Sequence, residues 1–64
     1  MCESNAYIRR GDDGEELLLG DVAKVTTAGG FITLEGILGN RITVRAELVE
    51  FDLMGHRLVL RELR

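Results

Sequence analysis

The stretch VAKVTTAGGFITLEG, residues 22–36, decides the fold of this chain. Its first half is a strand candidate, and Gly29-Gly30 is a dipeptide that supplies the positive φ angles of a tight hairpin turn. After the turn, the apolar residues Ile32 and Leu34 alternate with polar ones, which places both on one face of a second strand. The stretch therefore predicts an antiparallel pair of strands with one face turned toward a core.

The same pattern extends over the whole chain, which contains eight glycines and no proline. Short segments of alternating apolar and polar residues, with turns about every eight to twelve residues, are typical of a small all-β barrel or sandwich. We predict about six to seven short strands in a single domain, residues 1–64. The predicted strands are residues 6–10, 15–19, 22–27, 31–35, 41–45, 49–53 and 57–61. A helix within residues 46–54 is the one alternative.

The alternation also predicts which side chains form the core. The expected inward positions are Ile32, Leu34, Ile42, Val44, Leu58 and Leu60, together with both phenylalanines, Phe31 and Phe51. Leu18, Val59 and Leu63 are left over and are expected on the outer face or near a sheet edge. Because an apolar patch on so small a barrel is often covered by a second copy of the chain, we predict a homodimer.

Charge and composition argue against several classes of protein. The formal net charge is −3, with 11 acidic against 8 basic residues, whereas nucleic-acid binders owe much of their affinity to neutralised phosphates. Most of the arginines alternate with apolar residues, so we expect a solvated sheet face paired with carboxylates, with an RNA-binding stripe as the alternative. No apolar run approaches a membrane span, nothing resembles a secretory signal, and the single cysteine forms no internal disulfide. We expect a reducing, cytoplasmic compartment.

Catalytic motifs are scarce, and we predict that the protein is not an enzyme. The single histidine, His56, lies in a predicted turn and is expected to be exposed, with metal ligation as an alternative. A thiol enzyme that uses Cys2 and His56 is the weakest hypothesis, because side chains fill the interior of a barrel this small. The acidic run 12–16 lacks the spacing of a calcium loop, since the twelfth position counted from Asp12 is Ala23.

Cys2 offers the distinctive metal chemistry of this chain. Its thiolate, its own amide nitrogen and the terminal amine of Met1 lie on consecutive linkages, so they can close two fused chelate rings around one ion. If Met1 is removed, the amine and thiolate of Cys2 still close one ring. Mixed nitrogen and sulfur donors in a plane suit Ni(II) or Cu(II), whereas Zn(II) prefers a tetrahedron. By position alone, the favoured interpretation is still a reduced, inert thiol near a chain end.

Four segments together resemble the CooT-like family of small proteins. They are the opening Met1-Cys2-Glu3-Ser4-Asn5, the stretch Leu19-Gly20-Asp21-Val22, the central glycine-marked hairpin and the ending His56-Arg57-Leu58-Val59-Leu60. The resemblance covers essentially the whole chain, and its most specific part is Met-Cys-Glu at the start. It implies a homodimeric SH3-like β-barrel that binds Ni(II) through the cysteine at the second position, which is Cys2.

The resemblance makes metal binding the favoured interpretation of Cys2. The namesake of the family is an accessory protein for maturation of nickel-containing carbon monoxide dehydrogenase. We therefore expect a Ni(II) metallochaperone with Cys2 and Met1 as ligands, a dimer site that joins two Cys2 thiolates, and a client such as that enzyme. The alternative is a small β-barrel that binds RNA or protein without a metal, because the family spans members with no nickel enzyme nearby.

Overall fold

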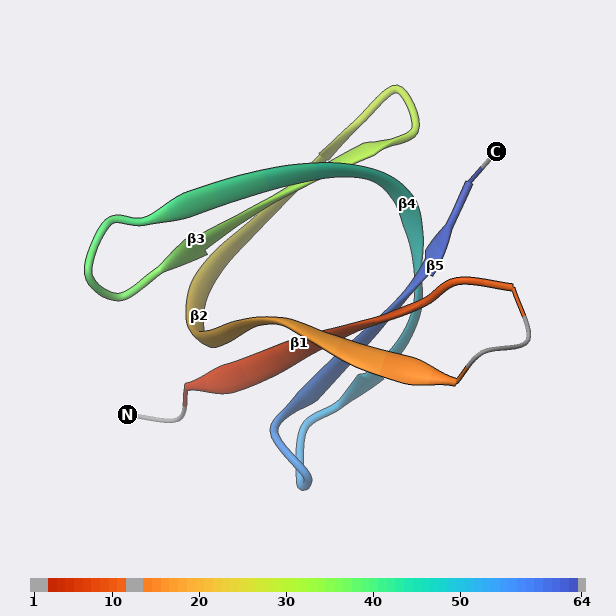
Figure 1. The fold of residues 1–64 in the computed structure, drawn as a ribbon. Helices are drawn as coiled ribbons and strands as arrows, with labels where there is room; N and C mark the ends of the chain where they lie inside the picture. The colour runs from red at the N-terminus through yellow and green to blue at the C-terminus, as the bar shows by residue number, and fades with distance from the viewer. Residues whose placement is uncertain (1–2, 12–13, 64) are drawn as a thin grey trace.

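The computed structural model describes residues 3–11 and 14–63, which form a closed β-barrel (Figure 1). The strands are β1 (Ser4–Arg9), β2 (Glu15–Ala28), β3 (Phe31–Gly36), β4 (Arg41–Asp52) and β5 (Arg57–Glu62). Each strand pairs antiparallel with the next, and β1 closes the ring by pairing parallel with β5. The predicted all-β class is thus confirmed. The described residues include no helix long and apolar enough to cross a membrane.

Five strands are described instead of the six to seven predicted, because β2 and β4 are long and serve two parts of the barrel. β2 continues through Gly20 and Asp21, where the sequence predicted a break. Asp21 has a φ of 52°, and the pairing register shifts on both sides of this bend. The first half of β2 pairs with β1 and its second half with β3. β4 pairs first with β3 and then with β5. It continues as a strand to Asp52, so the alternative of a helix within residues 46–54 is wrong.

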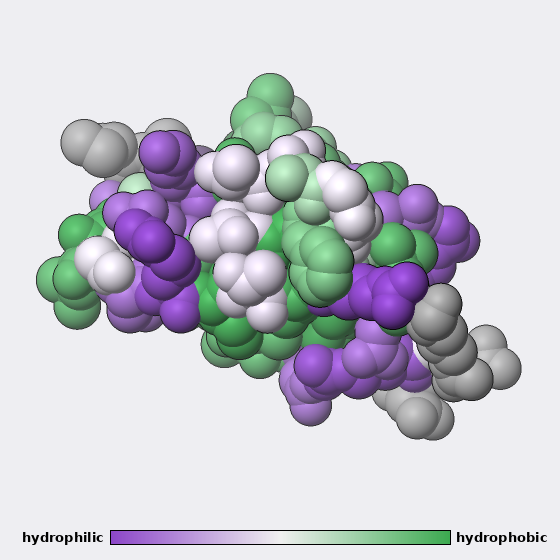
Figure 2. All heavy atoms as spheres, turned by 90° about the horizontal axis from the view of Figure 1, so that it is seen from above, coloured by the Kyte–Doolittle hydropathy of each residue, from purple (hydrophilic) through white to green (hydrophobic). Residues whose placement is uncertain are grey.

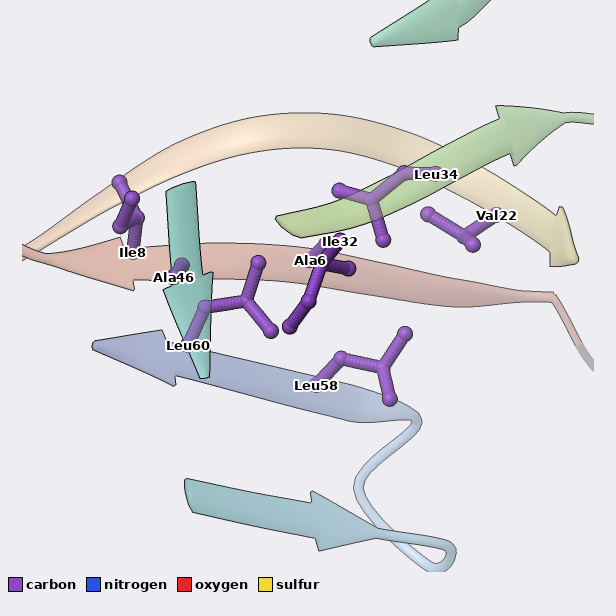
Figure 3. Packing of buried hydrophobic residues seen from close by; sticks show 8 residues of the cluster. All are labelled: Ala6, Ile8, Val22, Ile32, Leu34, Ala46, Leu58 and Leu60. Carbon is purple, nitrogen blue, oxygen red and sulfur yellow. The ribbon is translucent and has the colours of Figure 1, made fainter. Parts of the chain in front are cut away.

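The core lies between the two halves of the barrel (Figure 3). Its buried members are Ala6, Ile8, Val22, Ile32, Leu34, Ala46, Leu58 and Leu60, which come from all five strands. Ile42 and Val44 are partly buried and pack against this cluster. The six aliphatic positions that alternation turned inward are therefore confirmed.

The two phenylalanines are not in the core, contrary to the prediction. Phe31 is 49% exposed and Phe51 is 54% exposed. Phe31 precedes the buried Ile32 in β3, and successive side chains of a strand point to opposite faces, so Phe31 points away from the cluster. In β4, Phe51 pairs with the core residue Leu58 and shares its face, but it lies at the rim of an open groove and is therefore not covered.

Val59 is fully buried, although it was expected on an exposed outer face. It lies outside the core cluster and pairs with Tyr7 of β1. The Arg57 guanidinium carbon is 4.8 Å from the Tyr7 ring centroid, and the same guanidinium ion-pairs with Glu15 of β2. We attribute the burial of Val59 to this Arg57 side chain, because long arginine stems cover apolar surface.

Leu18 and Leu63 are also partly buried, so the expected exposed patch is made of other residues. The large exposed apolar side chains are Leu17, Phe31, Ile37, Leu38, Leu48, Val49, Phe51, Leu53 and Met54. Five of these lie between residues 48 and 54, at the end of β4 and in the turn that follows, and we call them the 48–54 patch. In the view from above, Figure 2 shows further apolar atoms at the surface between areas of charged side chains.

Truncating Leu34 to alanine should destabilise the barrel by about 2–5 kcal/mol, because Leu34 is fully buried in the cluster. Leu38→Ala is the matched control, since Leu38 is 91% exposed and surface changes usually stay within about 0.5 kcal/mol. The measurement is the free energy of unfolding in urea. Equal losses for the two variants would contradict the described core.

Candidate functional site

Cys2 and Met1, the predicted metal ligands, lie outside the described residues. The site is therefore defined by the residues that follow them along the chain. Ser4 opens β1 and pairs with Val22 of β2. Asn5 is the next residue, and it connects the start of β1 to two distant parts of the barrel.

Asn5 is held by hydrogen bonds on two sides. Its backbone N–H donates to the carbonyl oxygen of His56 at 2.9 Å. Its side-chain oxygen accepts a bond of 3.3 Å from the backbone N–H of Asp21. Gly20 leaves room for this contact, because a Cβ atom there would lie 3.3 Å from the Asn5 side-chain oxygen. The beginning of the chain is thus fastened to the bend of β2 and to the turn between β4 and β5.

The turn that contains His56 is organised by Asp52. One Asp52 carboxylate oxygen accepts hydrogen bonds from the backbone N–H groups of Met54, at 3.1 Å, and Gly55, at 2.9 Å. A Cβ atom at Gly55 would lie 2.6 Å from the other carboxylate oxygen, so a larger residue there would displace the Asp52 side chain. His56 follows with a φ of 54°, which turns the chain back into β5 beside Asn5.

The turn between β3 and β4 contacts the β2 bend that holds Asn5. Ile37 donates its backbone N–H to the Asp21 carbonyl oxygen at 3.0 Å. Val22 pairs with Gly36 on one edge and with Ser4 on the other. Two turns and one bend therefore meet around the first residues of β1, although they are far apart in the sequence.

These contacts place further donor groups around the chain start. His56 is half-buried in the predicted turn rather than fully exposed, and it is the one histidine of the sequence. Carboxylates are also nearby, on Asp21 of the bend and on Glu3, which precedes β1. Residues 3–11 and 14–63 on their own contain no group of three or more histidine, cysteine, aspartate or glutamate residues that could hold a metal ion. A site here needs donors from Cys2 or Met1.

The arginines pair with glutamates, as the sequence predicted. On the outer face of the barrel, Arg9 contacts Glu15 at 3.2 Å, and Arg61 of β5 ion-pairs with Glu47 of β4. The remaining pairs join Arg10 to Glu16 and Glu62, Arg41 to Glu35 and Arg57 to Glu15. Glu15 and Glu16 of the acidic run thus serve as arginine partners in a hairpin, which agrees with the rejection of a calcium loop.

Sequence reasoning proposed Cys2 and His56 as candidates, and these stay predictions, but it missed Asn5, Asp21 and Asp52. The spacing of Asp52 and Gly55 is a local turn signal that could have been found, because aspartate side chains bond to backbone N–H groups two or three residues later. The two bonds of Asn5 join segments distant in sequence, and periodicity contains no information about them.

Comparison with known proteins adds two findings. The family model described as CO dehydrogenase accessory protein CooT matches residues 1–61. A crystal structure of a candidate CooT from Carboxydothermus hydrogenoformans is similar, with a TM-score of 0.88 and 35% sequence identity. The match covers 98% of this chain and 100% of that chain. No curated protein matches significantly.

Replacing Asp52 by alanine should loosen the turn that holds His56 against Asn5, since two backbone donors lose their acceptor. We expect a loss of about 0.5–1.5 kcal/mol of stability, because the exposed donors can bond to water instead, together with faster hydrogen exchange of the Asn5 amide. Glu50→Ala is the control, because it removes a carboxylate of the same strand that no described hydrogen bond uses. An Asn5 amide that exchanges equally fast in both variants would show that Asp52 does not organise the turn.

Proposed function

The chain belongs to the CooT family of CO dehydrogenase accessory proteins, and we propose that it binds Ni(II) through Cys2 and delivers the ion to a nickel enzyme. The observation that supports this most is the position of Cys2, directly after Met1 in a chain that the family model matches from residue 1. In this proposal the protein is a carrier rather than a catalyst. Nickel is its cargo, and an enzyme such as carbon monoxide dehydrogenase is its partner.

The donor set at the chain start suits this ion. The Cys2 thiolate and the terminal amine of Met1, bridged by the Cys2 amide nitrogen, form two fused five-membered chelate rings when the amide loses its proton. Nitrogen and sulfur donors of this kind favour planar Ni(II) or Cu(II) over tetrahedral Zn(II). A site near a chain end is also easily reached by an acceptor protein, which suits transfer better than storage.

The contacts of Asn5 support a further donor for the same ion. Cys2 is three residues before Asn5, so the chain limits their separation to about 11 Å. The carbonyl oxygen of His56 accepts a hydrogen bond from the Asn5 backbone N–H, so His56 lies beside the start of β1. His56 is therefore the donor we propose as a substitute if the amine of Met1 does not bind.

We also propose that two chains form the nickel site together. The 48–54 patch ends at Met54, which is 93% exposed and lies in the same turn as His56. Since that turn is bonded to Asn5, a dimer interface over the patch would bring two chain starts near each other. Two Cys2 thiolates and two nitrogens could then complete one square-planar site.

The alternative, a barrel that binds RNA, has less support from the structure. The sequence offered its arginines as a binding stripe, but five of them ion-pair with glutamates within the described residues. Such pairs neutralise the charge that phosphate contacts require. The net charge of −3 acts in the same direction.

Ni(II) binding should require Cys2. Titration of the reduced wild-type protein should produce sulfur-to-nickel charge-transfer absorption, and Cys2→Ser should lose that band and most of the affinity. Binding should weaken at acid pH, because the thiol and the nitrogen donors must lose protons. Wild-type affinity in Cys2→Ser would refute the proposal.

The terminal amine can be tested separately. A tag placed before Met1 removes the nearby amine but keeps Cys2 and the barrel, and we expect nickel affinity to fall by about 10- to 100-fold. His56→Ala in the untagged protein should then have little effect. If the tag changes nothing and His56→Ala weakens binding, then the imidazole is the ligand in place of the amine. Circular dichroism spectra serve as the control for folding.

The metal-free protein should be a dimer at micromolar concentration, with about twice the chain mass in light scattering. Introducing a charge into the patch, as in Leu53→Glu or Met54→Glu, should shift the protein toward the monomer. Leu38→Glu is the control, because Leu38 is similarly exposed but lies in the turn between β3 and β4. A monomer that dimerises only after nickel is added would mean that the metal makes the interface.

A further inference from the structure

One edge of β2 has no strand beside it. β1 pairs with β2 only as far as Val22, which is opposite Ser4, whereas β2 continues to Ala28. Beyond Val22, β2 pairs with β3 on its other edge. Among residues 3–11 and 14–63, no segment pairs with the free edge from Ala23 to Ala28. A row of unpaired N–H and C=O groups accepts an extended segment as an additional strand.

A groove of about 410 Å³ lies along this free edge. Val22 and Val25 of β2 line one side, and Leu48 and Phe51 of β4 line the other. The rest of the lining comes from the core, the chain start and further residues of β2, namely Leu58, Ser4, Ala23, Lys24 and Thr27. A volume above about 300 Å³ with mostly apolar walls is typical of a binding cavity. The groove would receive those side chains of an added strand that point toward the barrel interior.

Lys24 lines the groove and also the outer face beside the same edge, where Glu35 and Arg41 lie near it. In β2, Lys24 pairs with Glu35 of β3, and Glu35 ion-pairs with Arg41 of β4 at 3.5 Å. Lys24 itself forms no ion pair within the described part of the chain. Side chains on an added strand alternate between the groove and this face, and a carboxylate opposite Lys24 would be favourable by about 0.2–1 kcal/mol.

We propose that the free edge of β2 binds an extended segment of a partner protein as an additional strand. The apolar side chains of that segment enter the groove, and an acidic side chain faces Lys24. Since Ser4 lines the groove, the bound segment lies beside the chain start. That the same partner receives nickel from Cys2 rests on the proposed function, whereas the strand contact itself does not.

One other occupant fits less well. A second copy of the chain would bring another Lys24 to the edge if it used its own β2, whereas an acidic partner brings the opposite charge. The 48–54 patch, which includes Leu48 and Phe51 at the rim of the groove, remains available to a second copy mainly through its exposed turn.

A phage-displayed library of random eight-residue peptides provides the probe, with the metal-free full chain as target. We expect selected peptides to alternate apolar and polar residues and to contain aspartate or glutamate. Selection on Lys24→Glu should enrich lysine or arginine instead. Arg45→Glu, which makes the same change of charge at an exposed residue outside the groove lining, should keep the acidic preference.

A selected acidic peptide, added to the isotopically labelled protein, should shift the amide signals of residues 23–28 and slow their hydrogen exchange. Its affinity should fall by about three- to tenfold in Lys24→Glu and stay unchanged in Arg45→Glu.

Failure to enrich peptides, an identical preference in Lys24→Glu, or shifts confined to other strands would overturn the proposal. Slow exchange, in the dilute free protein, of those amides of residues 23–28 that do not bond to β3 would overturn it as well, by showing that the chain covers this edge itself. Shifts of the same residues with protein concentration alone would assign the edge to a second copy. Each of these results leaves the nickel titration unaffected.

Discussion

β2 passes from one half of the barrel to the other at Gly20 and Asp21, and the rest of the structure depends on that bend. A strand of 14 residues can pair with β1 and then with β3 only if its backbone turns between the two ladders. Asp21 accepts the left-handed conformation that the turn requires, and its N–H is satisfied by the Asn5 side chain. The same bend therefore closes the barrel, holds the start of β1 and leaves one edge of β2 without a neighbour.

The sequence predicted the core better than it predicted the strands. Ile32, Leu34 and Leu58 could be assigned because alternation over short segments reports directly which face is buried. Strand lengths could not be predicted in the same way, because glycine followed by aspartate signals a break and a bend equally well. In β4, Phe51 is opposite Leu58 on the core face, yet it is 54% exposed at the rim of the groove, and alternation does not indicate where a barrel is open.

The candidate site was predictable only in its covalent part. The adjacency of thiol and amine is a property of the first two residues, and no folding is needed to recognise it. What surrounds the chain start depends on contacts between distant segments, such as the bond from Asn5 to His56. Val59 illustrates the same limit, because it is fully buried opposite Tyr7 of the distant strand β1, and no pattern within β5 indicates this.

The parallel pairing of β1 with β5 has a consequence for the order of events during synthesis. The first strand to leave the ribosome has its second neighbour in the last strand, so the barrel cannot close until β5 has emerged. Contacts of this sequence separation are slow to form, because the closure of a long loop precedes any gain from pairing. The bond between Asn5 and His56 belongs to the same late step. A nascent chain therefore acquires the folded surroundings of Ser4 and Asn5 only at the end of its synthesis, after β5 has joined the barrel.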